Sequence, residues 1–211
     1  MIEILIADDH SVVRRGLHQI LKEGFPEANI EEAVDADSII KKIQQKKYDV
    51  VLSDLSMPGK SGLDVITQIK EINSGIPILI LSIHPESQYA IRVLKAGASG
   101  YISKDLAPEE LVNAVKIVLK GKKYISPETE KNLRIRNSME ILKPAHDYLS
   151  DREFEVMKML AAGSSISEIA HNMSLSNTTV STYRSRILAK MNFKTNAEMV
   201  LYSLENKLIF K

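Results

Sequence analysis

The sequence predicts an α/β doubly wound five-stranded parallel sheet followed by a small all-α domain. Short apolar segments alternate with amphipathic ones across residues 1–121, a pattern typical of parallel βαβ units. From residue 147 to residue 211, the periodic segments are all helical. We therefore expect two domains, 1–121 and 147–211, joined by a polar linker at 122–146.

Each expected strand of the first domain is followed by an expected helix. The strands are predicted at 2–7, 30–34, 50–53, 76–81 and 100–103. The helices are predicted at 11–23, 35–45, 62–72, 87–96 and 108–119. With the strand order 2-1-3-4-5, the first and third strands are neighbours, and the functional crevice lies outside the carboxyl ends of the strands.

Capping boxes begin two helices of the second domain, because a serine and a glutamate three residues apart satisfy each other's backbone donors. They are Ser150 with Glu153 and Ser165 with Glu168. Two further helices are expected at 177–191 and 196–206, and one near 126–136 in the linker. Two short helices joined by a tight turn, the second of them basic, indicate a helix-turn-helix.

Composition limits the class of protein. A chain of 211 residues that is 44% hydrophobic fits two globular domains rather than a disordered chain. It has no cysteine, which excludes a disulfide framework and a thiolate metal site. We expect a cytoplasmic protein with no membrane association, because no apolar run resembles a signal peptide or a membrane span.

Charge is concentrated in one short stretch of the second domain. Residues 174–194 hold four basic side chains and no acidic one. Such a stretch fits a polyanion such as nucleic acid, but it is also common on any solvated helix. Charge alone therefore leaves both interpretations open.

Three carboxylates fall at one edge of the predicted sheet. Asp8 and Asp9 follow the first strand, and Asp54 follows the third. Neighbouring like charges need a cation, and hard oxygen ligands suit Mg²⁺. We favour Asp54 as a nucleophile toward phosphorus, because the turn after it would hold its side chain at the crevice. The Ser56 carbonyl would complete the metal shell.

A hydroxyl and an ammonium are expected at the same edge. Ser82 ends the fourth strand and Lys104 follows the fifth, so both would meet the oxygens of a phosphoryl group. Each residue taken alone is an ordinary loop residue, and only their convergence at matching strand ends favours a site. The histidines show no ligand spacing and are read as structural or surface residues, with His84 nearest the crevice.

Several motifs together resemble two-component response regulators of the NarL/FixJ type, over essentially the whole chain. The first domain carries the pair Asp8–Asp9, then DLSMPG beginning at Asp54, LS ending at Ser82 and GYISK ending at Lys104. The second carries LSDREFEVMKMLAAG, SISEIAHNMSLSNTTVSTYRSRILAKM and KTNAEMV, which are similar to LuxR-type helix-turn-helix domains.

This resemblance implies a phosphorylation switch. A sensor histidine kinase would phosphorylate Asp54, and Lys104 would hold a phosphoryl oxygen. Mg²⁺ would be held by Asp8, Asp9, Asp54 and the Ser56 carbonyl, with Asp8 acting directly or through water. Ser82 would move toward the phosphoryl group and Tyr101 would turn inward, which would favour a homodimer. Ile83 is bulkier than the small residue of many receivers and would crowd the site.

The resemblance also implies that the third helix of the second domain lies in the major groove of double-stranded DNA. Its buried face should hold Val180, Tyr183 or the stem of Arg184, Ile187 and Met191. The residues expected to face bases are Ser181, Thr182 and Ser185. Those expected at phosphates are Thr178, Thr179, Arg186 and Lys190. Short hydroxyls discriminate bases less than Arg or Asn, so specificity would depend on dimerisation.

Two other classes of function are consistent with parts of the sequence. A Mg²⁺-dependent phosphotransfer enzyme would use Asp54 as its catalytic nucleophile, but the chain has no substrate-binding insertion. An adaptor would use the helical domain to bind protein instead of DNA. We favour a phosphorylation-switched transcription regulator that is not an enzyme.

Overall fold

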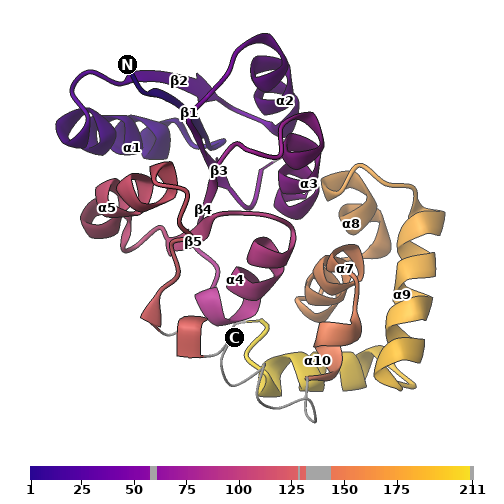
Figure 1. Ribbon diagram of the computed structural model, residues 1–211. Coiled ribbons are helices and arrows are strands. Elements are labelled where there is room, and N and C mark those ends of the chain that lie inside the picture. The colour runs from indigo at the N-terminus through magenta and orange to yellow at the C-terminus, as the bar shows by residue number, and fades with distance from the viewer. Residues whose placement is uncertain (58–60, 128, 132–143, 210–211) are drawn as a thin grey trace. The chain divides into compact units, whose positions relative to one another are not determined.

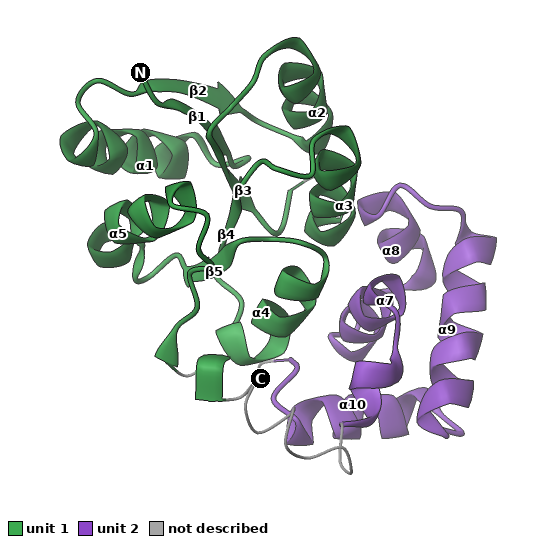
Figure 2. Cartoon of the chain, in the orientation of Figure 1, with its two compact units in different colours: residues 1–135 green, residues 136–211 purple. Residues whose placement is uncertain are grey.

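Five strands pair in parallel in the order β2-β1-β3-β4-β5 (Figure 1), so the predicted fold class and strand order are confirmed. The strands are β1 (Glu3–Ala7), β2 (Asn29–Ala33), β3 (Val50–Asp54), β4 (Ile78–Ser82) and β5 (Gly100–Ser103). The computed structural model describes residues 1–57, 61–127, 129–131 and 144–209. Contacts divide the chain into two units, residues 1–135 and 136–211 (Figure 2).

Helices cover both faces of the sheet in the first unit (Figure 1). They are α1 (Ser11–Gly24), α2 (Ala36–Gln45), α3 (Gly62–Ile72), α4 (Glu86–Lys95) and α5 (Ala107–Leu119). Every predicted strand and helix of this unit is present, with ends that differ by one or two residues. β4 begins two residues later than predicted, after Pro77, which has no amide hydrogen to donate to a ladder.

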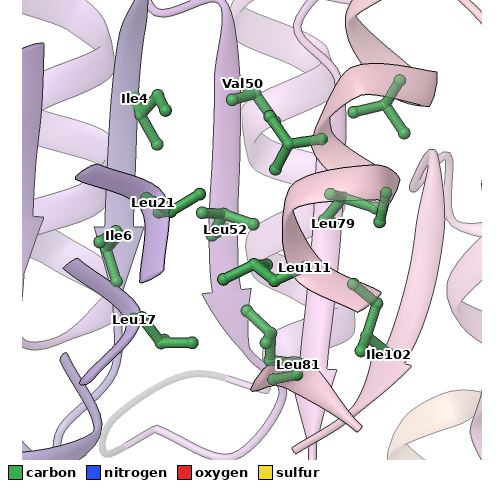
Figure 3. Packing of buried hydrophobic residues seen from close by; sticks show 14 of the residues in the cluster. Ile4, Ile6, Leu17, Leu21, Val50, Leu52, Leu79, Leu81, Ile102 and Leu111 are labelled. Carbon is green, nitrogen blue, oxygen red and sulfur yellow. The ribbon is translucent and has the colours of Figure 1, made fainter. Parts of the chain in front are cut away.

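Aliphatic side chains fill the space between the sheet and the pair α1 and α5 (Figure 3). Ile4, Ile6, Leu52 and Leu79 of this cluster have no exposed surface, and Leu111 of α5 packs among them. Every residue of β3 and β4 is buried, as expected for central parallel strands between two helical layers. The core therefore fixes the ends of β1, β3 and β4 at one edge.

Gly62 is required where α3 begins beside the end of β3. Its amide donates to the carbonyl oxygen of Leu55, the residue after Asp54, at 3.2 Å. A Cβ at position 62 would lie 2.3 Å from that oxygen, a separation that real atoms do not adopt. Any side chain there would therefore push the segment that follows Asp54.

The segment after α5 returns to the sheet. Tyr124 forms an isolated parallel bridge with Gly100 of β5. The helix predicted near 126–136 is present at residues 127 and 129–131, and its remaining positions lie outside the described residues.

The second unit is helical. Its elements are the 3₁₀ turn η1 (Ala145–Tyr148) and the helices α7 (Asp151–Ala161), α8 (Ile166–Asn172), α9 (Asn177–Met191) and α10 (Asn196–Glu205). Both predicted capping boxes are present, at Ser150 and Ser165. Ser174 adopts a left-handed φ of 55° in the tight turn between α8 and α9, and this turn completes the predicted helix-turn-helix.

In the described part of the chain, no helix has the length and apolar character needed to cross a bilayer.

The Gly62 contact yields a paired prediction. Gly62→Ala should lower the free energy of unfolding of the first unit by about 2 kcal/mol, because the new methyl group meets backbone. Gly16→Ala is the matched control: no atom lies within 4 Å of a Cβ there, and Gly16 is inside α1. It should raise stability by about 0.5–1 kcal/mol. Urea unfolding measures both, and equal effects of the two changes would contradict the contact.

Candidate functional site

The carboxyl edge of the sheet brings the predicted carboxylates together. Ala7 of β1 pairs with Ser53 of β3, so Asp8 and Asp54 leave neighbouring strands side by side. Asp8 is 1% exposed and Asp54 is 4% exposed. One ligand atom from each of Asp8, Asp9, His10 and Asp54 lies within 4.8 Å of all the others.

Lys104 connects the two buried carboxylates. Its Nζ lies 2.6 Å from Asp8 Oδ2 and 2.7 Å from Asp54 Oδ2. Burial raises the pKa of Asp54 above its ordinary value, and the hydrogen bond from Lys104 offsets only part of that rise. Burial alone would lower the pKa of Lys104, but its bonds to Asp54 and Asp8 raise it. Lys104 therefore keeps its proton at neutral pH.

The cluster fits a hard cation. Asp8 Oδ2 is buried and accepts no well-aligned hydrogen bond from the described residues, although the Lys104 ammonium lies 2.6 Å away. An oxygen in that state has room for a metal bond. The neighbouring Asp9 and Asp54 add further carboxylate oxygens, which are the ligands that Mg²⁺ prefers.

His10 is a member of the cluster that sequence reasoning missed. Its Nδ1 lies 2.8 Å from Asp9 Oδ1, and its amide donates to Asp8 Oδ1 at 2.8 Å. The sequence predicts a structural or surface role for this histidine, because the histidines show no ligand spacing. The available signal was its position immediately after the two aspartates.

The turn after β3 folds back on Asp54. The amide of Ser56 donates to Asp54 Oδ1 at 3.1 Å, so this oxygen is held while the other faces Lys104. Ser56 Oγ also bonds to Nε2 of His84 at 3.1 Å. His84 thus lies at the crevice, as expected from the sequence. The role of the Ser56 carbonyl as a metal ligand stays a prediction, and residues 58–60 of the same turn lie outside the described residues.

Ser82, at the end of β4, and Tyr101 of β5 both bond to the backbone of His84, which lies in the loop between β4 and α4. Ser82 is fully buried, and its Oγ accepts a hydrogen bond from the His84 amide at 3.1 Å. Tyr101 is 2% exposed and donates its hydroxyl to the His84 carbonyl at 2.6 Å. Burial raises the pKa of Tyr101 to about 12. The side chain of Tyr101 already lies inward. Ile83, between Ser82 and His84 in the chain, is 72% exposed.

Helix α9 shows the predicted buried face, because Val180, Ile187 and Met191 are buried. Most residues expected at bases or phosphates are exposed, while Thr179 and Ser181 are half-buried. Several of their hydroxyls already have partners within the helix. Thr182 Oγ1 donates to the Thr178 carbonyl at 2.9 Å, and Ser185 Oγ donates to the Ser181 carbonyl at 3.1 Å.

The basic residues of α9 differ in their partners. Lys190 Nζ lies 2.6 Å from Oε2 of Glu153, the buried capping residue of α7. Burial would raise the pKa of Glu153, but the bonds from Lys190 and Ser150 lower it. This ion pair competes with the predicted phosphate contact of Lys190. Arg186 is exposed and forms no ion pair with any residue in the described part of the chain.

The raised pKa of Asp54 predicts an unusual gain in stability. Burial and the neighbouring Asp8 disfavour the charged form of Asp54, so Asp54→Asn should raise the free energy of unfolding at pH 7 by about 1–2 kcal/mol in EDTA. The gain should shrink as pH falls toward the ordinary carboxyl pKa of about 4, because the wild-type group then takes up a proton.

Urea unfolding, read from amide exchange of β1 and β3, measures the stability of the first unit alone. Asp49→Asn, at the other end of β3, is the control and should show no such gain. A loss of stability for Asp54→Asn at pH 7 would contradict the inference that burial of the Asp54 carboxylate destabilises the fold.

Comparisons with known proteins agree with this geometry. A model of the response regulator receiver domain matches residues 4–116, and a model of bacterial regulatory proteins of the luxR family matches residues 147–203. The response regulator UvrY of Escherichia coli K12 is 33% identical over 99% of this chain and 96% of its own length. The oxygen regulatory protein NreC of Staphylococcus carnosus is 36% identical over 98% and 99%.

Solved structures give the same result. A structure of the Salmonella typhimurium RcsB response regulator superposes with a TM-score of 0.72 at 26% identity, covering 95% of this chain and 96% of its own. Both units of this chain are therefore matched in order, with the acidic cluster in the first and the helix-turn-helix in the second. The chain belongs to the DNA-binding response regulators, with an N-terminal receiver domain and a C-terminal luxR-family domain.

Proposed function

We propose that phosphorylation of Asp54 by a sensor histidine kinase controls transcription through DNA contacts of α9. The observation that carries this proposal is the buried Asp54 carboxylate, paired with Lys104 inside an acidic cluster at the carboxyl edge of the sheet. Such an acidic side chain is buried, has its charge partly neutralised by a lysine and lies next to a cation-binding cluster. It is therefore suited to accept a phosphoryl group.

Mg²⁺ would be held by Asp8, Asp9, Asp54 and the Ser56 carbonyl. When bound, the ion would neutralise charge on the phosphoryl oxygens and on the carboxylates. The chain's own residues supply the rest. Burial of Asp54 excludes water, and the Ser56 amide holds one of its oxygens in place. Lys104 is already 2.7 Å from the other oxygen and would follow the new negative charge.

Phosphoryl transfer from the kinase histidine to Asp54 needs no further reactant. An Asp54 oxygen forms a bond to phosphorus, the bond between phosphorus and the kinase histidine breaks, and the electron pair stays on the imidazole. The acyl phosphate adds oxygens for Lys104 and for the Ser82 hydroxyl. Ser82 would give up its bond from the His84 amide, and Tyr101 is already in the inward position.

On double-stranded DNA, the residues of α9 that would face bases are Ser181, Thr182 and Ser185. Those that would contact phosphates are Thr178, Thr179, Arg186 and Lys190. Structures of RcsB bound to promoter DNA with the phosphomimetic BeF₃⁻, and of RcsB dimers on DNA, support DNA binding and a homodimer. Thr182 and Ser185 donate to their own helix, so their remaining role toward a base is to accept or to pack. Each half-site would then discriminate weakly between base sequences, so sequence specificity would depend on dimerisation.

We also propose domain boundaries and a cellular location for this chain. The receiver would span 1–121, the linker 122–146 and the DNA-binding domain 147–211. The family matches at 4–116 and 147–203 support these bounds. A regulator of this kind would work in the cytoplasm, where it meets both kinase and DNA, and would catalyse no reaction on a separate substrate.

Intact-mass measurement tests the phosphoacceptor. Incubation with Mg²⁺ and a phosphodonor should add the mass of one phosphoryl group to the wild type, in a base-labile form, and EDTA should prevent the gain. Asp54→Ala should abolish it. Asp49→Ala, at the opposite end of β3, should phosphorylate as the wild type does. Retention of the full mass gain by Asp54→Ala would refute the assignment.

Salt-dependent DNA binding tests α9. Arg186→Ala should weaken binding about fivefold on every sequence at moderate salt and reduce the salt slope by about one, because a phosphate contact is lost. Lys190→Ala should weaken binding less but destabilise the second unit, since Glu153 would lose its partner. Lys41→Ala, on α2 of the receiver, is the charge control. Unchanged binding of both α9 variants would refute the docking of α9, whereas a wild type that binds no DNA would favour the adaptor alternative.

A further inference from the structure

The first residues after α5 form a strap, defined here as residues 124–127 and 129. The Tyr124 amide donates to the Ser99 carbonyl at 2.8 Å, and Tyr124 bridges to Gly100 at the edge of β5. A Cβ on Gly100 would lie 2.7 Å from the Tyr124 carbonyl oxygen, so the close approach depends on glycine. The strap therefore covers part of the β5 edge.

Two glutamates hold the strap from the first turns of α4 and α5. Ser126 Oγ donates to Glu86 Oε1 at 2.5 Å, and Thr129 Oγ1 donates to the same oxygen. The Tyr124 hydroxyl donates to Glu110. Thr129 is only 3% exposed, so its bond to Glu86 is shielded from water. Hydrogen bonds to a carboxylate are stronger than neutral ones, and Glu86 carries two of them.

Glu86 directly follows the loop that contacts the phosphoacceptor pocket. His84 lies two residues earlier, and its amide and carbonyl bond to Ser82 and Tyr101 respectively. Any movement of Ser82 toward Asp54 must break or stretch the first of these bonds. Only Pro85, whose ring fixes φ, separates His84 from Glu86.

We propose that Glu86 is a positioning residue that couples the phosphoacceptor pocket to the strap, and that phosphorylation loosens the strap. This inference rests on the proposed function. In the unphosphorylated chain, Glu86 accepts hydrogen bonds from Ser126 and Thr129 and thereby holds the strap on the receiver. Once Ser82 turns to the phosphoryl group, the loop and Glu86 move, these two bonds are lost and the strap loosens.

Hydrogen exchange of the full-length protein tests the coupling. Mg²⁺ with BeF₃⁻ is the probe, and its binding is followed separately by fluorine NMR. In the wild type, BeF₃⁻ should speed exchange of the Tyr124 amide about tenfold. Glu86→Ala should exchange as fast without BeF₃⁻ and show no further change with it. Glu86→Gln, which keeps an acceptor oxygen, should retain part of the protection. Glu109→Ala, on the exposed side of α5, should behave as the wild type.

The outcomes separate the two proposals. If BeF₃⁻ binds and leaves Tyr124 exchange unchanged or slower in the wild type, the coupling is wrong while the phosphoacceptor assignment stands. If BeF₃⁻ does not bind in the presence of Mg²⁺, the proposed function fails and the coupling fails with it. If Glu86→Ala still responds to BeF₃⁻, the strap is coupled through another residue and the role given to Glu86 is wrong.

Discussion

The ammonium of Lys104, placed between the buried carboxylates of Asp8 and Asp54, is the interaction on which the receiver site depends. Two such carboxylates on adjacent strands repel each other, and the fold brings them together through the β1–β3 register. One cation cannot neutralise both, and Asp9 adds a third negative charge at the rim. The remaining negative charge and the unused lone pairs of Asp8 Oδ2 make the edge a place where a second cation is favourable.

The sequence was sufficient to predict the members of this site that stand at strand ends. In a parallel sheet, strand ends share one edge, so a periodic pattern converts positions far apart in the chain into neighbours. Asp8, Asp54, Ser82 and Lys104 were placed by that rule alone. The strand order, which brings β1 beside β3, is a common order of doubly wound sheets, and the structure confirms it.

Contacts made by loops and by long side chains could not be predicted in this way. The bond between Ser56 and His84 joins two loops whose conformations depend on tertiary packing rather than on period. His10 was missed because its ring turns back onto Asp9 instead of following a helical stripe. The ion pair of Lys190 with Glu153 was hidden because the capping box explained that glutamate by local structure, which left no reason to seek a partner on α9.

Rigid and adjustable parts of the receiver are separated along the chain. β3 and β4 are buried throughout, so the carboxylate of Asp54 and the backbone of Ser82 start from fixed positions. The loop beyond Ser82 is different, because the bonds described for it join single hydroxyls to the backbone of His84. A hydroxyl can exchange one acceptor or donor for another at small net cost, since each hydrogen bond contributes only about 1 kcal/mol. A hydrogen bond to a charged phosphoryl oxygen would contribute more than that. A change at one carboxylate would therefore alter the loop without disturbing the sheet.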